Sequence, residues 1–368
     1  MNINLILLGA TGDLSNKKIL PAIGELIFKN PQLAISIYPW SRKDIDLQKL
    51  NASLNKHYQS GYTIKETLIG EYLEVGIISN FLQTHQDDFN IIYLAIPPEQ
   101  NLPFVKMISR FNNQNFELII EKPYSQSLEE FEKLNELIFK NRLEGRVNFL
   151  DHYLFKDAFG VNPSIQKLLN TCTNQDITSV DIQIQEFLDI QDRKDFYDNT
   201  GCIGDMFFHL FNLYTNTIKR INPNDKTPLN YTDFSLVNLV KAQYTSYQEE
   251  LGKISLTETA FQAIFKYKNI NITLQSSKKM PEKITQISIF FANQTQLVWN
   301  IYPLAKVELH SKFTYTNLKL KQENSDHYNL FLALIAGDKS NFVSSKDIVC
   351  GLSLIRTLQS TNTIIHNY

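Results

Sequence analysis

The sequence predicts an α/β domain followed by an α+β domain. Short apolar runs alternate with helix-like segments through roughly the first 150 residues, which is the pattern of a doubly wound parallel sheet. Beyond residue 151, alternating apolar and polar runs follow one another without long helices between them, which favours a large, mostly antiparallel sheet. Because 368 residues exceed the size at which a single core keeps growing, we expect two domains, 1–150 and 151–368.

The first domain is predicted to begin with a strand, a tight turn and a helix. The apolar run 3–8 is followed by a glycine-containing turn at 9–12 and by an amphipathic stretch at 18–28. Ser127 precedes an acidic first turn and is a suitable N-cap, so a helix is expected to run from there to about Asn141. The other expected elements are strands at 34–38, 91–96, 117–120 and 147–150 and a helix at 102–111.

The second domain is predicted to be built mainly of strands. Helical periodicity is present only at 203–218 and 327–336, and the polar stretch 222–232 is expected to be a loop. The expected strands are 180–187, 258–265, 271–274, 285–291, 296–301 and 307–313.

Composition excludes several classes of protein. Lys and Arg (36) nearly balance Asp and Glu (38), which leaves no basic field for a nucleic-acid partner. No apolar run approaches the ~20 residues of a membrane span, and the start of the chain shows no secretory signal. The cysteines at 172, 202 and 350 are far apart, so we expect neither disulfides nor a metal site, and a reducing cytoplasm fits best.

Two motifs in the first domain suit a nicotinamide dinucleotide. Residues Gly9–Ala10–Thr11–Gly12 lie between the first strand and the first helix, where glycines and the helix N-terminus of a Rossmann-type domain hold a pyrophosphate. The spacing is less specific than GxGxxG, and a plain tight turn is the alternative. After the second strand, Arg42 favours the 2′-phosphate of NADP over NAD, and an ordinary surface Arg-Lys pair is its alternative.

Polar residues also follow two later strands of this domain. Asp151, His152, Tyr153 and Lys156 follow the run 147–150, at the strand end where α/β enzymes tend to keep their sites. The alternative is a buried Asp-His pair that holds a turn. Lys122, in Glu-Lys-Pro, would project at the carboxyl edge of the sheet, and Pro123 could form a cis bond there. A strand-terminating turn is the alternative.

These motifs, taken in order, make the chain resemble the glucose-6-phosphate dehydrogenase family. The resemblance rests on 9–21, on Tyr-Leu-Ala-Ile-Pro-Pro at 93–98, on Glu-Lys-Pro at 121–123 and on Asp-His-Tyr at 151–153. It continues in the second domain through 243–244, 257–259, Lys278 and 337–338. It covers nearly the whole chain, although this chain is shorter than a typical member. It implies a Rossmann-type domain, a sugar phosphate substrate and a homodimer formed through the large sheet.

The resemblance also implies a role for each matching residue. Lys122 would contact the sugar hydroxyls, and His209, oriented by Asp151, would be the general base, since a carboxylate fixes the tautomer and stabilises the imidazolium. The substrate residues would be His152, Tyr153, Lys156, Glu186, Asp205 and Lys278. Four of them, His152, Tyr153, Lys156 and Lys278, would hold the phosphate dianion. The cofactor, NADP with NAD possible, would contact Gly9, Thr11, Gly12, Asp13, Leu14, Lys18, Ser41, Arg42, Ala95, Pro97, Glu121 and Lys122.

The chain departs from the family pattern near the expected phosphate site. Phe155 replaces a glycine, which would place a bulky ring beside the phosphate. Residues 275–278 read Gln-Ser-Ser-Lys where Arg-x-Gly-Lys is usual, and the Trp-x-Gly-Val-Pro-Phe landmark before them is absent. These changes leave the identity of the sugar open.

The position of the expected base also departs from the family. His209 follows Asp205 by four residues instead of five, which puts both side chains on one helix face. This spacing, combined with Glu-Lys-Pro, is similar to the related family of sugar and inositol dehydrogenases. The alternative is a core histidine beside Phe207 and Phe208.

The sequence therefore predicts an NADP-dependent dehydrogenase that oxidises a hexose phosphate, with glucose 6-phosphate as the favoured substrate. A different sugar, sugar phosphate or nucleotide sugar is the first alternative. A binding protein that keeps the fold and has lost turnover is the second.

Overall fold

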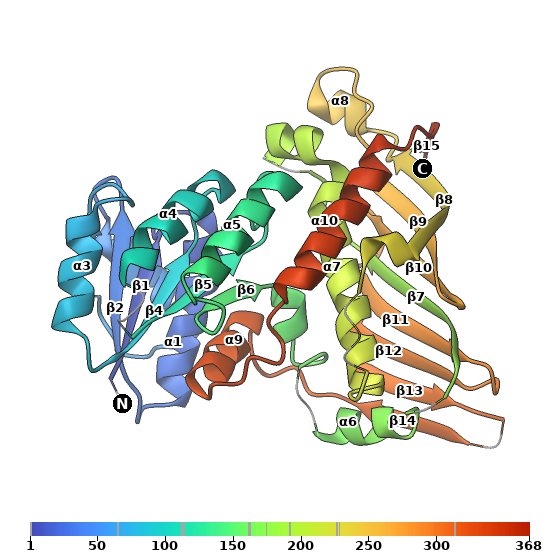
Figure 1. The fold of residues 1–368 in the computed structure, drawn as a ribbon, viewed down its shortest axis with the longest axis horizontal. Helices are drawn as coiled ribbons and strands as arrows, with labels where there is room; N and C mark the ends of the chain where they lie inside the picture. Colours follow the sequence, from blue (N-terminus) through green and yellow to red (C-terminus); the bar gives the residue numbers. More distant parts are fainter. Residues whose placement is uncertain are drawn as a thin grey trace. The chain divides into compact units, whose positions relative to one another are not determined.

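The computed structural model describes residues 2–64, 66–111, 115–160, 163–173, 175–190, 193–225, 227, 229–312 and 314–368. The chain divides into two compact units (Figure 1). One consists of Met1–Phe155 and Asn324–Ser345, and the other of Lys156–Glu323 and Lys346–Tyr368. Residues 151–155 and 324–345, which the sequence pattern placed in the second domain, lie in the first unit.

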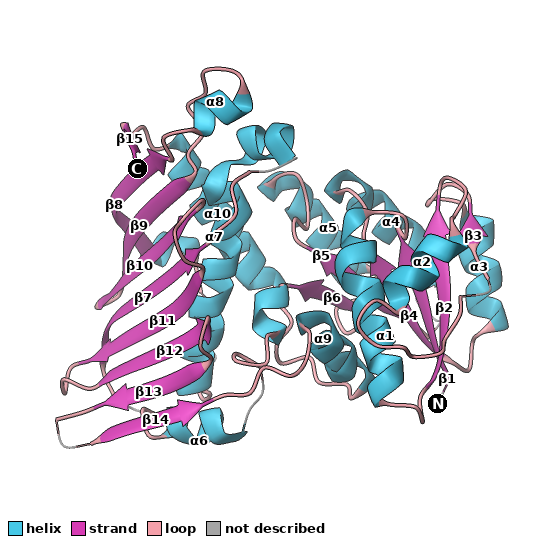
Figure 2. Cartoon of the chain, turned by 180° about the vertical axis from the view of Figure 1, so that it is seen from behind, coloured by secondary structure: helices cyan, strands magenta, loops and turns pink. Residues whose placement is uncertain are grey.

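The first unit contains a parallel sheet with the strand order β3-β2-β1-β4-β5-β6 (Figure 2). β1 is buried along all but its first residue, because helices cover both faces of such a sheet, and after that residue only Asn4 interrupts its apolar sequence. The strands are β1 (Asn2–Leu8), β2 (Ala34–Ser41), β3 (Leu68–Ile69), β4 (Phe89–Leu94), β5 (Glu117–Glu121) and β6 (Val147–Leu150). The predicted α/β class is confirmed.

Some helices of the first unit begin at a residue whose side chain caps them. Ser127 Oγ accepts a hydrogen bond from Glu130 N (3.2 Å), so the predicted N-cap of α5 is confirmed. α9 packs against α1 and η4, which is why its segment belongs to this unit. The helical segments are η1 (Ser15–Ile19), α1 (Leu20–Lys29), α2 (Leu47–Leu54), α3 (Val75–Thr84), η2 (Pro98–Gln100), α4 (Asn101–Ile108), η3 (Ser109–Phe111), α5 (Leu128–Lys140), η4 (His152–Phe155) and α9 (Asp326–Ile335).

The second unit contains a large, mostly antiparallel sheet, as predicted. Its strand order is β14-β13-β12-β11-β7-β10-β9-β8-β15, with parallel pairing between β7 and β10 and between β8 and β15. The strands are β7 (Ile177–Gln185), β8 (Phe234–Gln243), β9 (Ala260–Tyr267), β10 (Ile270–Ser277), β11 (Ile284–Phe291), β12 (Gln296–Tyr302), β13 (Lys306–His310), β14 (Tyr315–Lys319) and β15 (Ile365–Asn367). Phe313, the end of one predicted strand, lies outside the described residues.

The long helix α7 (Lys194–Ile221) lies on one face of this sheet, against β7, β9 and β10 (Figure 1). It is kinked at Gly201, whose φ of 66° suits glycine. Glu258 Oε1 accepts a hydrogen bond from Ile203 N (2.9 Å) and so caps the helical segment that continues beyond the kink. The predicted helix at 203–218 begins at this cap. The other helical segments are α6 (Pro163–Asn170), η6 (Tyr231–Asp233), α8 (Tyr247–Leu251) and α10 (Ser345–Ser360).

Across the described part of the chain, every helix is too short or too polar to cross a lipid bilayer.

Candidate active site

The glycine turn lies at the carboxyl ends of three neighbouring strands. Gly9 N donates to Trp40 O near the end of β2 (3.0 Å), and Ala95 N, just after β4, donates to Leu8 O (3.1 Å). Gly9 has a φ of 75°, and a Cβ at this position would lie 2.1 Å from Ala95 O. Only glycine therefore fits, and the turn brings backbone close to the N-terminus of the following helix, as a pyrophosphate site requires.

The residues expected at the adenosine ribose lie next to this turn. Thr11 Oγ1 and Ser41 Oγ are 3.5 Å apart, and Ser41 Oγ accepts a hydrogen bond from Lys43 N (3.2 Å). The exposed Arg42 guanidinium lies over the Tyr72 ring, 5.6 Å from its centroid. Sequence reasoning missed Tyr72, whose ring offers Arg42 a cation–π support beside the expected 2′-phosphate.

The remaining predicted cofactor residues lie around the same edge of the sheet. Asp13 forms an exposed ion pair with Lys17 (2.7 Å), and Lys18 is exposed one residue further along. Leu14 is in the first helical turn, and Pro97 precedes η2 after β4. These positions are compatible with a dinucleotide, and their individual roles stay predictions.

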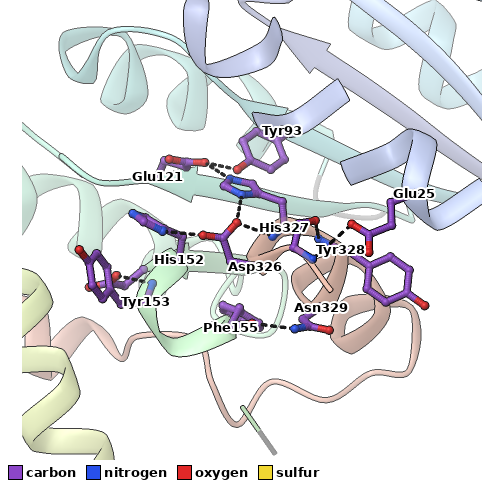
Figure 3. Close-up of polar contacts among 12 residues, drawn as sticks. Glu25, Tyr93, Glu121, His152, Tyr153, Phe155, Asp326, His327, Tyr328 and Asn329 are labelled. Carbon is purple, nitrogen blue, oxygen red and sulfur yellow. Dashed lines mark hydrogen bonds and ion pairs between the residues drawn. The ribbon is translucent and has the colours of Figure 1, made fainter. Parts of the chain in front are cut away.

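The Glu-Lys-Pro segment begins with Glu121, the last residue of β5. The Lys122–Pro123 bond is cis, as predicted. Glu121 accepts hydrogen bonds from the Tyr93 hydroxyl on β4 and faces His327 Nε2 of α9 at 3.0 Å (Figure 3). The peptide before Lys122 is thus held by a carboxylate with partners on two other elements.

The Asp-His-Tyr segment follows β6 and forms the short helix η4. Asp151 is buried, and its Oδ1 accepts a hydrogen bond from Tyr153 N (3.0 Å). His152 Nδ1 lies 2.9 Å from Asp326 Oδ2, a residue that sequence reasoning did not select (Figure 3). Tyr153 is also buried, with its ring centroid 4.9 Å from that of His152.

Phe155, expected to place a bulky ring beside the phosphate, is buried in the first unit. Its ring is 1% exposed and packs against Phe342, with 5.1 Å between the ring centroids. Its backbone oxygen accepts a hydrogen bond from Asn329 Nδ2 (2.9 Å). The apolar ring is directed into the core of the first unit, because burial there removes it from water.

In the second unit, three predicted substrate residues come together. Lys278 follows β10, Glu186 follows β7 and Asp205 lies on α7. Lys278 Nζ forms an ion pair with Asp205 Oδ2 at 3.0 Å and a second one with Glu186. Burial disfavours the ammonium, but the two carboxylates outweigh it and raise the pKa of Lys278. Two carboxylates around one ammonium are better suited to sugar hydroxyls than to a phosphate dianion.

His209 lies one helical turn after Asp205 on the same face of α7, as its spacing predicted. Its aromatic neighbours occupy other faces of this helix. The Phe207 ring contacts Phe261 and Phe265 of β9. The Phe208 ring lies close to Gly351 of α10, where an added Cβ would be only 2.7 Å from it. The side chain of His209, 6% exposed, therefore shares its face with a predicted substrate residue.

Predictions that join residues of the two units stay predictions. Asp151, His152 and Lys122 belong to the first unit, whereas Lys156, Lys278 and His209 belong to the second. The pairing of Asp151 with His209 is one of them.

This fold, with its glycine turn at the edge of a parallel sheet, defines the class of two-domain dehydrogenases that bind a nicotinamide dinucleotide. Residues 6–160 match the sequence model of a family described as glucose-6-phosphate dehydrogenase, NAD binding domain. Over these residues the chain is similar in sequence to the glucose-6-phosphate dehydrogenase family.

Similar proteins span both units. Glucose-6-phosphate 1-dehydrogenase of Helicobacter pylori strain J99 is 26% identical over 97% of this chain and 93% of its own length. The Dictyostelium discoideum enzyme of that name is 24% identical over 94% of this chain and 86% of its own. The crystal structure of the Mycobacterium avium enzyme has a TM-score of 0.77 at 19% identity and covers 100% of this chain and 94% of the other. KijD10, a 3-ketoreductase from Actinomadura kijaniata, has a TM-score of 0.63 at 13% identity and covers 100% and 99%, which supports the fold alone.

Proposed function

We propose that the protein oxidises glucose 6-phosphate at C1 to 6-phosphogluconolactone, with NADP as the hydride acceptor. The observation that carries this proposal is the match to glucose-6-phosphate 1-dehydrogenases over nearly the whole chain, with Lys122 and His152 in the motifs on which the resemblance rests. A homodimer and a cytoplasmic location stay predictions.

In this proposal each side chain acts on a defined part of the substrate. A bound nicotinamide would supply the acceptor for the hydride from C1. His209, as the neutral imidazole, takes the proton of the C1 hydroxyl, and Asp151 orients the ring and stabilises the imidazolium that forms. Lys122 holds a sugar hydroxyl, and His152, Tyr153 and Lys156 hold the phosphate. Binding the remote phosphate positions C1 for the reaction.

The direct test is the rate of nicotinamide reduction by the purified protein with NADP or NAD and a panel of aldoses. Saturable reduction of NADP by glucose 6-phosphate, with unphosphorylated glucose much slower, is the expected result. Binding of NADP without reduction across the whole panel would contradict the proposed activity and support a binding protein.

A second candidate function is the oxidation of a different sugar or nucleotide sugar. The paired state of Lys278 and the four-residue spacing of Asp205 and His209 favour it. In the same panel, a preference for an unphosphorylated sugar would replace the first candidate with this one.

Cofactor selectivity is predicted to depend on Arg42. Arg42→Ala should weaken NADP binding roughly ten- to a hundredfold and leave NAD nearly unchanged, since a hydrogen bond to a charged group is worth about 1.5–3 kcal/mol. Dissociation constants for both cofactors measure this effect. The exposed neighbour Lys43 supplies the control, because Lys43→Ala should change neither constant. Equal weakening of both cofactors by Arg42→Ala would remove Arg42 from the 2′-phosphate.

The two lysines assigned to the phosphate are predicted to behave differently. Lys156→Ala should raise KM for glucose 6-phosphate about tenfold or more and spare free glucose, because only the former carries a dianion. Lys278→Ala should impair both sugars, because it leaves Glu186 and Asp205 without their shared cation. Steady-state kinetics on folded protein separate the two patterns. Lys167→Ala, at an exposed lysine on α6, is the control. If Lys156→Ala and Lys278→Ala changed the kinetics with the two sugars in the same way, the predicted difference between these lysines would be wrong.

A further inference from the structure

A histidine that is not among the predicted site residues lies at the centre of a buried polar network in the first unit (Figure 3). His327, on α9, is 2% exposed. Its Nε2 faces Glu121 Oε1 of β5 at 3.0 Å, and its Nδ1 faces Asp326 Oδ1 at 2.9 Å. The network therefore connects the residue before Lys122 to α9.

The same network reaches the expected phosphate-binding segment. The other oxygen of Asp326, Oδ2, lies 2.9 Å from His152 Nδ1 in η4. The His152 and His327 rings are stacked, with their centroids 6.2 Å apart and 20° between their planes. Two segments far apart in the sequence, at 121–123 and 151–153, are thus joined through Asp326 and His327.

The geometry of His327 determines its protonation state. Both ring nitrogens face carboxylate oxygens, which are acceptors only, so both nitrogens must donate and the ring must be the imidazolium. Burial alone would lower the pKa of His327, but the hydrogen bonds and charges of Asp326 and Glu121 raise it to about 9. The described residues contain no group of three or more His, Cys, Asp or Glu arranged to hold a metal ion, which leaves the ion-pair interpretation.

The ionisable groups around His327 fit one charge pattern. Burial would raise the pKa of Glu121, but the hydrogen bond and charge of His327, with the hydrogen bond from Tyr93, hold it below its ordinary value. Burial would likewise raise the pKa of Asp326, but its hydrogen bonds with His152 and His327 and the charges of both rings hold it well below its ordinary value. The Tyr93 hydroxyl, whose pKa burial and Glu121 raise well above its ordinary value, stays protonated and donates to Glu121. His152 completes the set from η4. Loss of the His327 proton would leave a nitrogen lone pair facing a carboxylate inside this cluster.

We propose that His327 is a positioning residue for the sugar phosphate: as the imidazolium, it ties Glu121 to Asp326 and so holds both the peptide before Lys122 and the ring of His152 in place for binding. The kinetic part of this inference rests on the function proposed above. The charged state of His327 does not depend on it.

The kinetic test compares His327→Gln with the wild type. The variant is expected to have a KM for glucose 6-phosphate raised about tenfold or more, because two segments that contact the substrate lose their common partner. Its affinity for NADP should fall much less, because among the expected cofactor residues only Glu121 and its neighbour Lys122 depend on His327. Because kcat/KM depends on the imidazolium, it should fall above about pH 9 in the wild type, and this limb should be missing in the variant. His57→Gln, at an exposed histidine of the same unit, should reproduce the wild-type values and profile.

A spectroscopic test on the wild-type protein keeps the inference open to contradiction if the variant fails to fold. With ¹⁵N-labelled histidine, the resonances of one of the seven histidines should show two protonated ring nitrogens at pH 7 and titrate near pH 9. Their absence from the His327→Gln variant assigns these resonances to His327. A lowered titration midpoint in Asp326→Asn gives the same assignment. A neutral His327 at pH 7 would overturn the proposal, as would a variant whose KM and pH profile match the wild type. If the wild type oxidises no sugar phosphate, the proposed function fails, and the titration still decides whether the ion-pair network exists.

Discussion

Replacing His209 by asparagine is expected to lower kcat by roughly 100- to 10,000-fold, the contribution of a general base, while NADP affinity stays nearly unchanged. The structural basis is the face that His209 shares with Asp205 on α7, away from the contacts of Phe207 and Phe208. Asparagine fills a similar space but cannot accept the hydroxyl proton. Asp151→Asn should act in the same direction, and the two losses should not add if the residues form one unit.

The measurement is kcat per folded molecule, because a buried residue on a packed helix can also affect stability. Thr215→Val, at a side chain that is 1% exposed on the same helix, is the matched control and should lower stability without lowering turnover of the folded fraction. If His209 only filled the core, His209→Asn would behave like this control. Near-wild-type turnover would therefore refute the catalytic role.

Among glycine-to-alanine substitutions in the turns of the first unit, Gly9→Ala should lower the free energy of unfolding and the affinity for the cofactor the most. The positive φ of 75° costs alanine about 1–2 kcal/mol, and overlap with Ala95 O, 2.1 Å from the new Cβ, adds roughly 1–3 kcal/mol. Relief of this overlap must move the turn, so NADP affinity should fall at least about tenfold. Denaturant unfolding and cofactor titration measure the two effects.

Gly61 provides a matched control for this substitution. It has a φ of 70°, and a Cβ there would meet no heavy atom within 4 Å. Gly61→Ala should therefore cost only the backbone part, about 1–2 kcal/mol, and leave NADP affinity intact. Equal effects of the two substitutions would mean that the close approach of Gly9 to Ala95 is not what the turn requires.

The strands that sequence alone predicted are those whose burial follows a simple period. β1 reads as one apolar run because it is buried on both faces, and β11 and β12 alternate because one face is covered. β8 was missed because its pairing with β9 shifts register between Leu236 and Asn238, and this irregularity interrupts the alternation. β14 is almost wholly exposed, and β3 and β15 are too short to carry a pattern.

The parts of the site that could be predicted are those encoded in short motifs. The glycine turn, the cis Lys122–Pro123 bond and the shared face of Asp205 and His209 each depend on a few neighbouring residues. His327 could not be found in this way, because its partner Glu121 is 206 residues away in the sequence. The direction of the Phe155 ring and the two carboxylates around Lys278 are likewise set by tertiary packing.

The proposed reaction moves the hydride from C1 of glucose 6-phosphate to the nicotinamide, and isotope transfer tests this claim most directly. The purified protein would be incubated with NADP and glucose 6-phosphate deuterated at C1, and both products would be examined by mass spectrometry. We expect the deuterium on the reduced nicotinamide and none at C1 of the oxidised sugar phosphate. Reduced nicotinamide without deuterium, or deuterium that stays on the sugar, would contradict oxidation at C1.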